Sequence, residues 1–593
     1  MTLHCLARIT LACATVVTPM PLRALAVSDS TTSSRELAAR VAIISAHQLE
    51  TELDTRLRLG LPMERLPDPS NAAALAEGSW ARAQLQALGR LKAVGLTQEE
   101  QITLRYLAWQ LQAARDAALF HWLSFASVTP YSSPIRTITQ ALGALPLATD
   151  TDRSRYRRVQ AELPVFLGVV RNELGEQARR GIRLSAAEIP PVINILRAFR
   201  TASEVSPFGP SAAQLAQIDS ASRATFTTRA RAIVADRITP ALDSLIGVFD
   251  SAYVARAPKS VGLSQYPGGR EYYRYLVRLH TTTELTPAEI HQIGLREVAR
   301  VERDMAAIRR EVAFTGTARE FLEQMRHDQR WYAKAPDEVG ERLTAYLRRI
   351  EPALPTMFLH VPRAKGDVRR LDQRREAGQT FGYYDAPSAS DSIGHYYYNG
   401  SNLAERPLMN AAALVYHEIL PGHHFQMSLQ LENATLPSLR RNSYQTAYTE
   451  GWAEYASRLG GEMGMLPDPY ERYGRLLMDM FLSCRLVVDT GMNEFGWSRD
   501  SASTYMLARL IESPTQIASE TLRYSTDLPG QALGYKIGVL EFLRLREKAK
   551  QELGPAFDIR AFHDVVLSSG SLPMTVLAWK VNQWIATELA RRN

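Results

Sequence analysis

The sequence predicts a mainly α-helical protein of two lobes with a small β-sheet, and three observations support this prediction. Helix-start signals followed by apolar residues at three- and four-residue steps recur along the chain. A clear β signal occurs in one short region, within residues 380–398. A Pro/Gly-rich segment, residues 257–269, follows a long helical region. Because 593 residues exceed what one compact core usually serves, we expect two subdomains.

Capping boxes mark the expected helix starts. In this motif a Ser or Thr side chain and a Glu three residues later each bond the other's backbone N–H. Thr97 to Glu100, Ser185 to Glu188 and Thr286 to Glu289 fit the pattern. Pro287 occupies the first helical position after the third box, where its missing N–H costs nothing. We expect a helix after each box.

The first 26 residues have the features of a signal peptide. Arg8 gives a weakly positive start, Ile9–Val17 is apolar, and Ala24–Ala26 matches an A-x-A cleavage site. The apolar run is shorter than the about 20 residues that span a membrane. We therefore expect a mature chain with no integral membrane segment, in the periplasm or secreted. A buried first helix is the alternative.

Composition limits the class of protein and its partners. We assign residues 27–256 to an N-terminal helical subdomain and 257–593 to a subdomain that carries the candidate chemistry. With 46% hydrophobic and 22% charged residues, the chain is typical of globular proteins. The net charge of +7 is small, and no basic block is interleaved with aromatic residues, so no nucleic-acid partner is expected. Cleavage after residue 26 leaves only Cys484, so no internal disulfide is expected.

Two β-prone runs, Thr380–Tyr384 and Ile393–Tyr398, are separated by Pro387 and a Ser/Asp-rich connection. One interpretation is that the strand nearest the following helix is an edge strand that pairs with an extended substrate backbone. The other is a structural hairpin whose tyrosines pack. The sequence leaves both open.

A metal-binding pattern follows these strands. His417, Glu418 and His423 lie close together in the sequence, and Glu450 comes later. Two imidazoles and one carboxylate are a common ligand set for catalytic zinc, which leaves one position open for water. Zinc lowers the pKa of that water to about 7 and polarises a carbonyl group, while a neighbouring carboxylate transfers the proton. We assign His417, His423 and Glu450 as metal ligands and Glu418 as the general base.

The spacing of the two histidines requires a break in the helix. On a continuous helix His423 would lie about 600° round the axis and about 9 Å along it from His417, too far to share one ion. Pro421 disrupts a helix and Gly422 accepts unusual backbone conformations. The sequence therefore predicts a bulge that returns His423 to His417. His424 is the weaker candidate ligand, and the alternative for it is to point toward substrate.

Other residues are candidates for supporting roles. Glu454, one turn after Glu450, either accepts an N–H from a ligating histidine or lies on a solvated surface. Asp489 lies in an apolar run, either as an orienting carboxylate or as a cap of a turn before Gly491. The oxyanion of a tetrahedral intermediate needs a hydrogen-bond donor, which contributes about 2.7–4 kcal/mol. We select Tyr535 as this catalytic donor. Arg523 and Tyr524 are the next candidates, for the oxyanion or a substrate carboxylate.

These residues closely resemble a bacterial family, domain of unknown function 885, which is grouped with zincin-like (gluzincin-type) metallopeptidases. The resemblance covers most of the chain after about residue 260, and the helical part before it more loosely. It implies a zinc-dependent, peptidase-like helical fold with a cleft between the lobes that favours short peptides. One departure is Asn493, where many relatives carry His. The matching motifs are His417–Gln426, Glu450–Tyr455, Arg485–Gly491, Gly496–Ser498, Pro529–Gly538, Thr281–Thr286 and Gly394–Asn399.

The expected function is a zinc-dependent hydrolase that cleaves peptide bonds. A zinc hydrolase of a non-peptide amide or ester would use the same ligands. A non-catalytic periplasmic binding protein is a third possibility, and it predicts a fourth ligand such as His424. The sequence does not determine the cleavage preference, exo- or endo-action, the identity of the metal or the oligomeric state.

Overall fold

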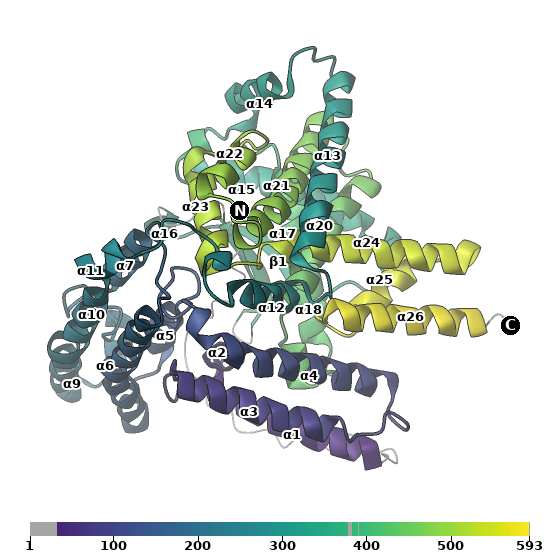
Figure 1. The fold of residues 1–593 in the computed structure, drawn as a ribbon. Helices are drawn as coiled ribbons and strands as arrows, with labels where there is room; N and C mark the ends of the chain where they lie inside the picture. Colours follow the sequence, from purple (N-terminus) through teal and green to yellow (C-terminus); the bar gives the residue numbers. More distant parts are fainter. Residues whose placement is uncertain (1–31, 377–381, 389–390, 592–593) are drawn as a thin grey trace. The chain divides into compact units, whose positions relative to one another are not determined.

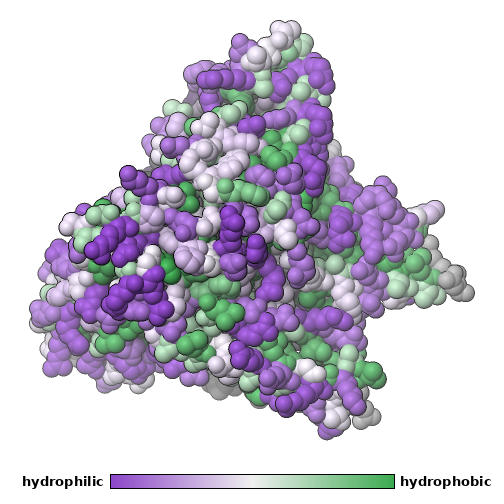
Figure 2. All heavy atoms as spheres, viewed as in Figure 1, coloured by the Kyte–Doolittle hydropathy of each residue, from purple (hydrophilic) through white to green (hydrophobic). Residues whose placement is uncertain are grey.

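The computed structural model describes residues 32–376, 382–388 and 391–591 and is mainly helical with one small sheet (Figure 1). The signal peptide expected at residues 1–26 lies outside the described residues. None of the helices among the described residues is long and apolar enough to cross a membrane. On the face shown in Figure 2, hydrophilic and hydrophobic residues are interspersed, in keeping with the mixed composition.

The chain forms two compact units. In the described residues, the N-terminal unit comprises 32–272 with 525–528, and the C-terminal unit comprises 273–524 and 529–591. The division falls within α12 (Gly269–Thr281), so the Pro/Gly-rich segment 257–269 groups with the N-terminal unit. The helices before α12 are α1 (Thr32–Thr51), α2 (Leu53–Arg58), α3 (Asn71–Leu88), α4 (Gln98–Ala117), α5 (Pro134–Ala144), α6 (Asp150–Arg179), α7 (Ile189–Phe199), α8 (Ala212–Leu215), α9 (Ser220–Ile233), α10 (Thr239–Ile246) and α11 (Ser251–Ala255).

The C-terminal unit holds the candidate chemistry and the sheet. Its strands are β1 (Lys365–Arg370), β2 (Gly382–Asp385) and β3 (Ile393–Tyr398). Its helices are α13 (Pro287–Glu311), α14 (Ala318–His327), α15 (Pro336–Ile350), α16 (Gln373–Glu376), α17 (Ala411–Glu418), α18 (His423–Glu432), α19 (Ser438–Arg441), α20 (Thr446–Glu462), α21 (Pro469–Asn493), α22 (Arg499–Leu507), α23 (Pro514–Leu522), α24 (Leu533–Leu553), α25 (Ile559–Leu567) and α26 (Met574–Ala590).

Two of the three predicted capping boxes are confirmed. Thr97 caps α4 and Thr286 caps α13, and in each the Glu three residues later bonds back to the capping residue's N–H. The box at Ser185 is wrong. There α7 begins at Ile189, and Glu188 instead accepts a hydrogen bond from Ser525 at 2.6 Å. Glu188 is thus the residue before the helix and not the third helical residue that a capping box requires.

The sheet differs from the prediction in the position of its strands. The order is β1-β3-β2, with β3 parallel to β1 and antiparallel to β2. The strand that precedes the histidine helix, β3, is therefore central, and the prediction that it is an edge strand is wrong. Its backbone already pairs on both sides and is closed to an added strand. Thr380 and Phe381 of the first predicted run lie outside the described residues.

Close packing between α20 and α24 positions the helix that carries Glu450. A Cβ atom on Gly538 would lie 2.0 Å from the carbonyl oxygen of Ala447, and one on Gly451 would lie 2.5 Å from Gly538. On its other side α20 meets α17, where Ser457 donates a hydrogen bond to the carbonyl group of Ala413 at 2.9 Å. Small residues thus let the backbones of these helices approach closely.

We predict that Gly538→Ala lowers the stability of the C-terminal unit. The added methyl group must separate α20 from α24, and overpacking of this kind costs about 1–3 kcal/mol. Calorimetry should show a lower Tm for this variant. The matched control is Gly461→Ala on α20, whose Cβ would meet only ordinary contact, Leu466 at 3.8 Å, and whose Tm should stay the same or rise. Equal Tm values for the two variants would contradict the proposed close contact.

Candidate metal centre

The predicted interruption of the histidine helix is confirmed. Helix α17 ends at Glu418 and α18 begins at His423. Between them Ile419 has φ −116° and ψ −84°, outside the helical region, and the Leu420–Pro421 peptide bond is cis. The indole N–H of Trp452 donates to the carbonyl group of Pro421 at 2.9 Å, which ties the break to α20.

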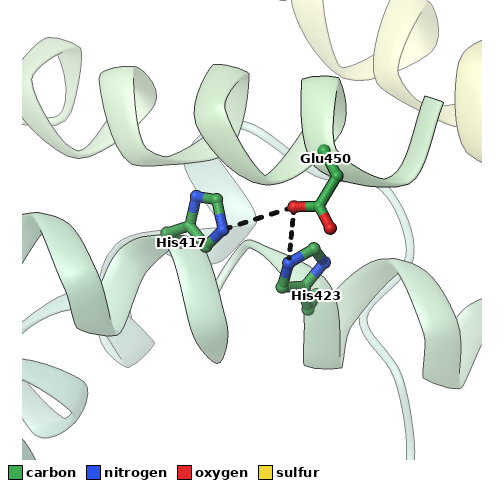
Figure 3. Close-up of side chains that lie close together, drawn as sticks. All are labelled: His417, His423 and Glu450. Carbon is green, nitrogen blue, oxygen red and sulfur yellow. Dashed lines mark ion pairs between the residues drawn. The ribbon is translucent and has the colours of Figure 1, made fainter. Parts of the chain in front are cut away.

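The break brings the three predicted ligands together (Figure 3). The imidazole rings of His417 and His423 have centroids 4.7 Å apart and lie almost perpendicular to each other. Oε2 of Glu450 lies 3.8 Å from Nε2 of His417 and 3.4 Å from Nε2 of His423. One ligand atom from each residue lies within 4.8 Å of the other two. Among the described residues this is the one cluster of His, Cys, Asp or Glu with such geometry.

The ligand atoms are buried without hydrogen-bond partners. All three side chains are fully buried. Nε2 of both histidines and Oε2 of Glu450 form no hydrogen bond with the described residues. A buried polar atom without a partner costs about 1–3 kcal/mol. Three such atoms that face one another are the arrangement that a shared cation would satisfy.

Tyr444, which the sequence did not indicate, positions Glu450. Its hydroxyl donates to Oε1 of Glu450 at 2.7 Å, which leaves Oε2 to face the histidines. Burial raises the pKa of Glu450, but His423, His417 and the hydrogen bond from Tyr444 outweigh burial, so the pKa lies below its ordinary value. The carboxylate is therefore held in its ionised, ligand-competent form.

Glu418 is buried beside the ligands at the last position of α17. The pKa of its carboxyl group is raised to about 8, mainly by burial and also by the charges of Glu450 and Glu454, while His417 acts to lower it. Its Oε2 has no hydrogen-bond partner among the described residues. Glu418 is thus a carboxyl group close enough to His417 and Glu450 to feel their charges, with its Oε2 not engaged by another described residue.

His424 does not belong to the cluster. Its Nδ1 lies 2.8 Å from the hydroxyl of Tyr384 on β2, and its Nε2 lies 3.0 Å from the carbonyl oxygen of Ala364 just before β1. The expectation that His424 points toward substrate is wrong, because the ring is fully buried against the sheet. Both ring nitrogens are engaged, so His424 offers no fourth ligand atom in this arrangement.

Glu454 is fully buried, and the alternative that it lies on a solvated surface is wrong. Its Oε1 lies 2.8 Å from Nδ1 of His417, and its Oε2 accepts from Arg475 on α21 at 2.9 Å. Burial raises the pKa of Glu454, but Arg475 and His417 bring it below its ordinary value. A charged carboxylate therefore lies behind His417, the first candidate ligand.

The hydrogen bonds of Asp489 go to Tyr273, Asn493 and Gly530 rather than to the candidate ligands. It accepts hydrogen bonds from the hydroxyl of Tyr273 at 2.7 Å and the N–H of Gly530 at 3.0 Å. Helix α21 continues through Gly491, so Asp489 caps no turn there. Asn493 is buried beside it and donates to the carbonyl group of Tyr524 at 2.9 Å.

Tyr535 lies on α24 and is fully buried. Its hydroxyl has no hydrogen-bond partner among the described residues. Burial raises the pKa of Tyr535 and Glu450 raises it further, while Arg485 and Arg523 lower it. The hydroxyl is thus a protonated donor close enough to Glu450 to feel its charge.

The other two oxyanion candidates are engaged elsewhere. Arg523 donates to Gln531 at 2.6 Å. Tyr524 binds Glu520 through its hydroxyl and accepts a hydrogen bond from Arg485 at 2.7 Å. The structure therefore places these two residues in a buried polar group rather than among the three ligands.

Comparison with known proteins identifies the family. The profile of the family DUF885, described as bacterial protein of unknown function, matches residues 54–581, and the chain belongs to this family. No curated protein matches the chain.

Two solved structures share the fold. A protein of Colwellia psychrerythraea, described as a "putative lipoprotein", is 26% identical with a TM-score of 0.86, over 94% of this chain and 100% of that one. A "putative lipoprotein of unknown function" of Shewanella oneidensis is 18% identical with a TM-score of 0.71, over 92% of this chain and 99% of that one. The fold thus occurs over nearly the full length of both proteins.

The pKa of Asp489 makes stability depend on pH. Burial raises this pKa from 3.8 to about 7, against the hydrogen bonds that lower it. A raised carboxyl pKa contributes stability that is complete below the unfolded value and is lost as pH rises through the folded value. We predict that Asp489→Asn gains about 3 kcal/mol relative to wild type between pH 5 and pH 8, since one pKa unit corresponds to about 1.4 kcal/mol.

Denaturant unfolding of both proteins across this pH range measures the difference. Asn retains an acceptor for Tyr273 and Gly530, so the comparison isolates ionisation. Parallel pH profiles for the two proteins would show that Asp489 keeps the same charge state throughout.

Proposed function

We propose that this protein is a zinc-dependent hydrolase of peptide bonds, with Glu418 as general base and Tyr535 as oxyanion donor. The observation that carries the proposal is the buried cluster of His417, His423 and Glu450, whose facing atoms lie within 4.8 Å and lack hydrogen-bond partners among the described residues. Two imidazoles and one carboxylate match the ligand set of a catalytic zinc site.

The donor set of two imidazoles and one carboxylate fits a divalent cation, and His424 would not add a fourth protein ligand. His424, the one other histidine of the motif, uses both ring nitrogens within the protein. His417, His423 and Glu450 would hold the zinc, which would supply a water with a pKa lowered to about 7 and a Lewis acid for a carbonyl group. The engagement of His424 within the protein favours a catalytic site over a structural metal site closed by a fourth protein ligand.

The remaining residues supply proton transfer and charge stabilisation. Glu418 takes a proton from the attacking water at its Oε2 and delivers it to the leaving amine. The Tyr535 hydroxyl donates to the oxygen that gains charge when the carbonyl carbon becomes tetrahedral. Its raised pKa keeps that proton in place near neutral pH. Tyr444 holds Glu450 by Oε1 throughout.

The proposed substrates are short peptides. This part of the proposal comes from the resemblance to helical zincin-like peptidases. A zinc hydrolase of a non-peptide amide or ester would use the same residues, and a screen of peptides, amides and esters distinguishes the two. We also propose that the protein is exported, which agrees with the signal-like first 26 residues and with the description of two relatives as "putative lipoproteins".

Glu418→Gln tests the reaction. We expect both this variant and wild type to bind one zinc per chain, and the variant to lose cleavage of a peptide mixture, because the amide is unable to accept the proton. Metal content is measured by mass spectrometry and cleavage by identification of product peptides. Glu341→Gln, an exposed position on α15, is the matched control and should retain full activity.

Equal cleavage by Glu418→Gln and wild type would falsify the mechanism. Absence of zinc from purified wild type, even after zinc is added, would remove the metal centre itself. Cleavage by the control but not by Glu418→Gln also excludes a contaminating peptidase.

Tyr535→Phe tests the oxyanion donor. Loss of the hydroxyl should reduce kcat by about 10²-fold or more while zinc remains bound, as for oxyanion donors in other enzymes. The control is Tyr505→Phe on α22, where kcat should not change. Steady-state kinetics on one identified peptide measures both. A normal kcat in Tyr535→Phe would assign this hydroxyl to packing alone.

A further inference from the structure

A buried chain of polar contacts leads away from the metal centre. Nδ1 of His417 lies 2.8 Å from Oε1 of Glu454, and Oε2 of Glu454 accepts from Nη2 of Arg475 at 2.9 Å. The three residues come from α17, α20 and α21, and the side chains of His417 and Glu454 are fully buried. These polar contacts therefore link three helices on the side of His417 opposite the ring nitrogen that faces Glu450.

The 2.8 Å contact with Glu454 favours a proton on Nδ1 of His417. A neutral imidazole has one N–H, and a carboxylate at Nδ1 favours the proton on that nitrogen. Nε2 then presents its lone pair toward Oε2 of Glu450, where a metal ion would be shared. A carboxylate behind a ligating histidine also makes the imidazole a stronger base.

Arg475 is available to hold Glu454 because its acidic neighbour is already satisfied. Asp479, one turn further along α21, pairs with Arg300 at 2.7 Å, with Arg458 at 3.3 Å and with Lys536. Among the described residues, Arg475 donates hydrogen bonds to Glu454 alone, to its carboxylate and, at 3.5 Å, to its backbone carbonyl group. Glu454 would otherwise be a buried carboxylate near two others, Glu450 and Glu418.

We propose that Arg475 is a positioning residue that sets the affinity of the centre for zinc. Through Glu454 it fixes the orientation and the Nδ1-protonated form of His417. The inference rests on the proposed function in that His417 must bind the metal, but it does not depend on the substrate or on the reaction.

The test is zinc affinity in variants of Arg475. Arg475→Met keeps the apolar stem and removes the donor, and its Kd for zinc should rise by about 10–100-fold, the usual effect of losing a residue behind a metal ligand. Arg475→Lys keeps one charged donor and should have a Kd between those of wild type and the Met variant. Competition with a chromophoric chelator measures Kd, and calorimetry of the metal-free proteins measures folding.

Arg300→Met is the matched control, because Arg300 contacts Asp479 in the same helix but not Glu454. Its Kd should stay within about threefold of wild type. An unchanged Kd in Arg475→Met, or an equal rise in Arg300→Met, would overturn the positioning role. If Arg475→Met does not fold, Glu454→Gln replaces it and should show the same rise. Wild type that binds no zinc would instead contradict the proposed function, so the two failures are distinguishable.

Discussion

The candidate metal centre depends on the close approach of Gly422 to the carbonyl group of His417. A Cβ atom on residue 422 would lie 1.8 Å from that oxygen and 2.6 Å from the carbonyl oxygen of Tyr416, so any other side chain would force the segment apart. This contact lets the chain turn within the four residues that separate Glu418 from His423. The hydrogen bond from Trp452 to Pro421 then joins the turn to the helix of Glu450. Two histidines six positions apart face one carboxylate because of this local geometry.

Local signals in the sequence predicted the parts of the fold that local chemistry determines. The capping boxes at Thr97 and Thr286 need only four consecutive residues. Strand β1 was not predicted, because Lys365–Arg370 is mostly charged and has no apolar alternation. It forms because its backbone pairs in parallel with β3, with Lys365 opposite Ile393 and Arg370 opposite Tyr398. Because β1 pairs with one side of β3 and β2 with the other, β3 is central, a property that its own residues do not encode.

For the candidate site, too, the sequence predicted only the residues that carry a local signal. His417, His423 and Glu450 were predicted because ligand-type residues around a Pro-Gly step fit poorly with a plain core helix. Tyr444 and Arg475 gave no such signal, since a tyrosine before a helix and an arginine within one are common. Their roles come from tertiary packing, which places the Tyr444 hydroxyl 2.7 Å from Glu450 and Arg475 2.9 Å from Glu454.

Charge balance connects the buried carboxyl groups of the candidate site with a bound cation. Glu418, Glu450 and Glu454 are three buried carboxyl groups in neighbouring turns of two helices. Arg475 compensates Glu454, which leaves Glu418 and Glu450 without a cationic side chain among their hydrogen-bond partners in the described residues. Burial of uncompensated charge is costly, so a fold that retains both groups gains stability from a cation at the same place. A divalent ion between His417 and Glu450 would balance both carboxylates, and Glu418 could then remain ionised as a general base requires.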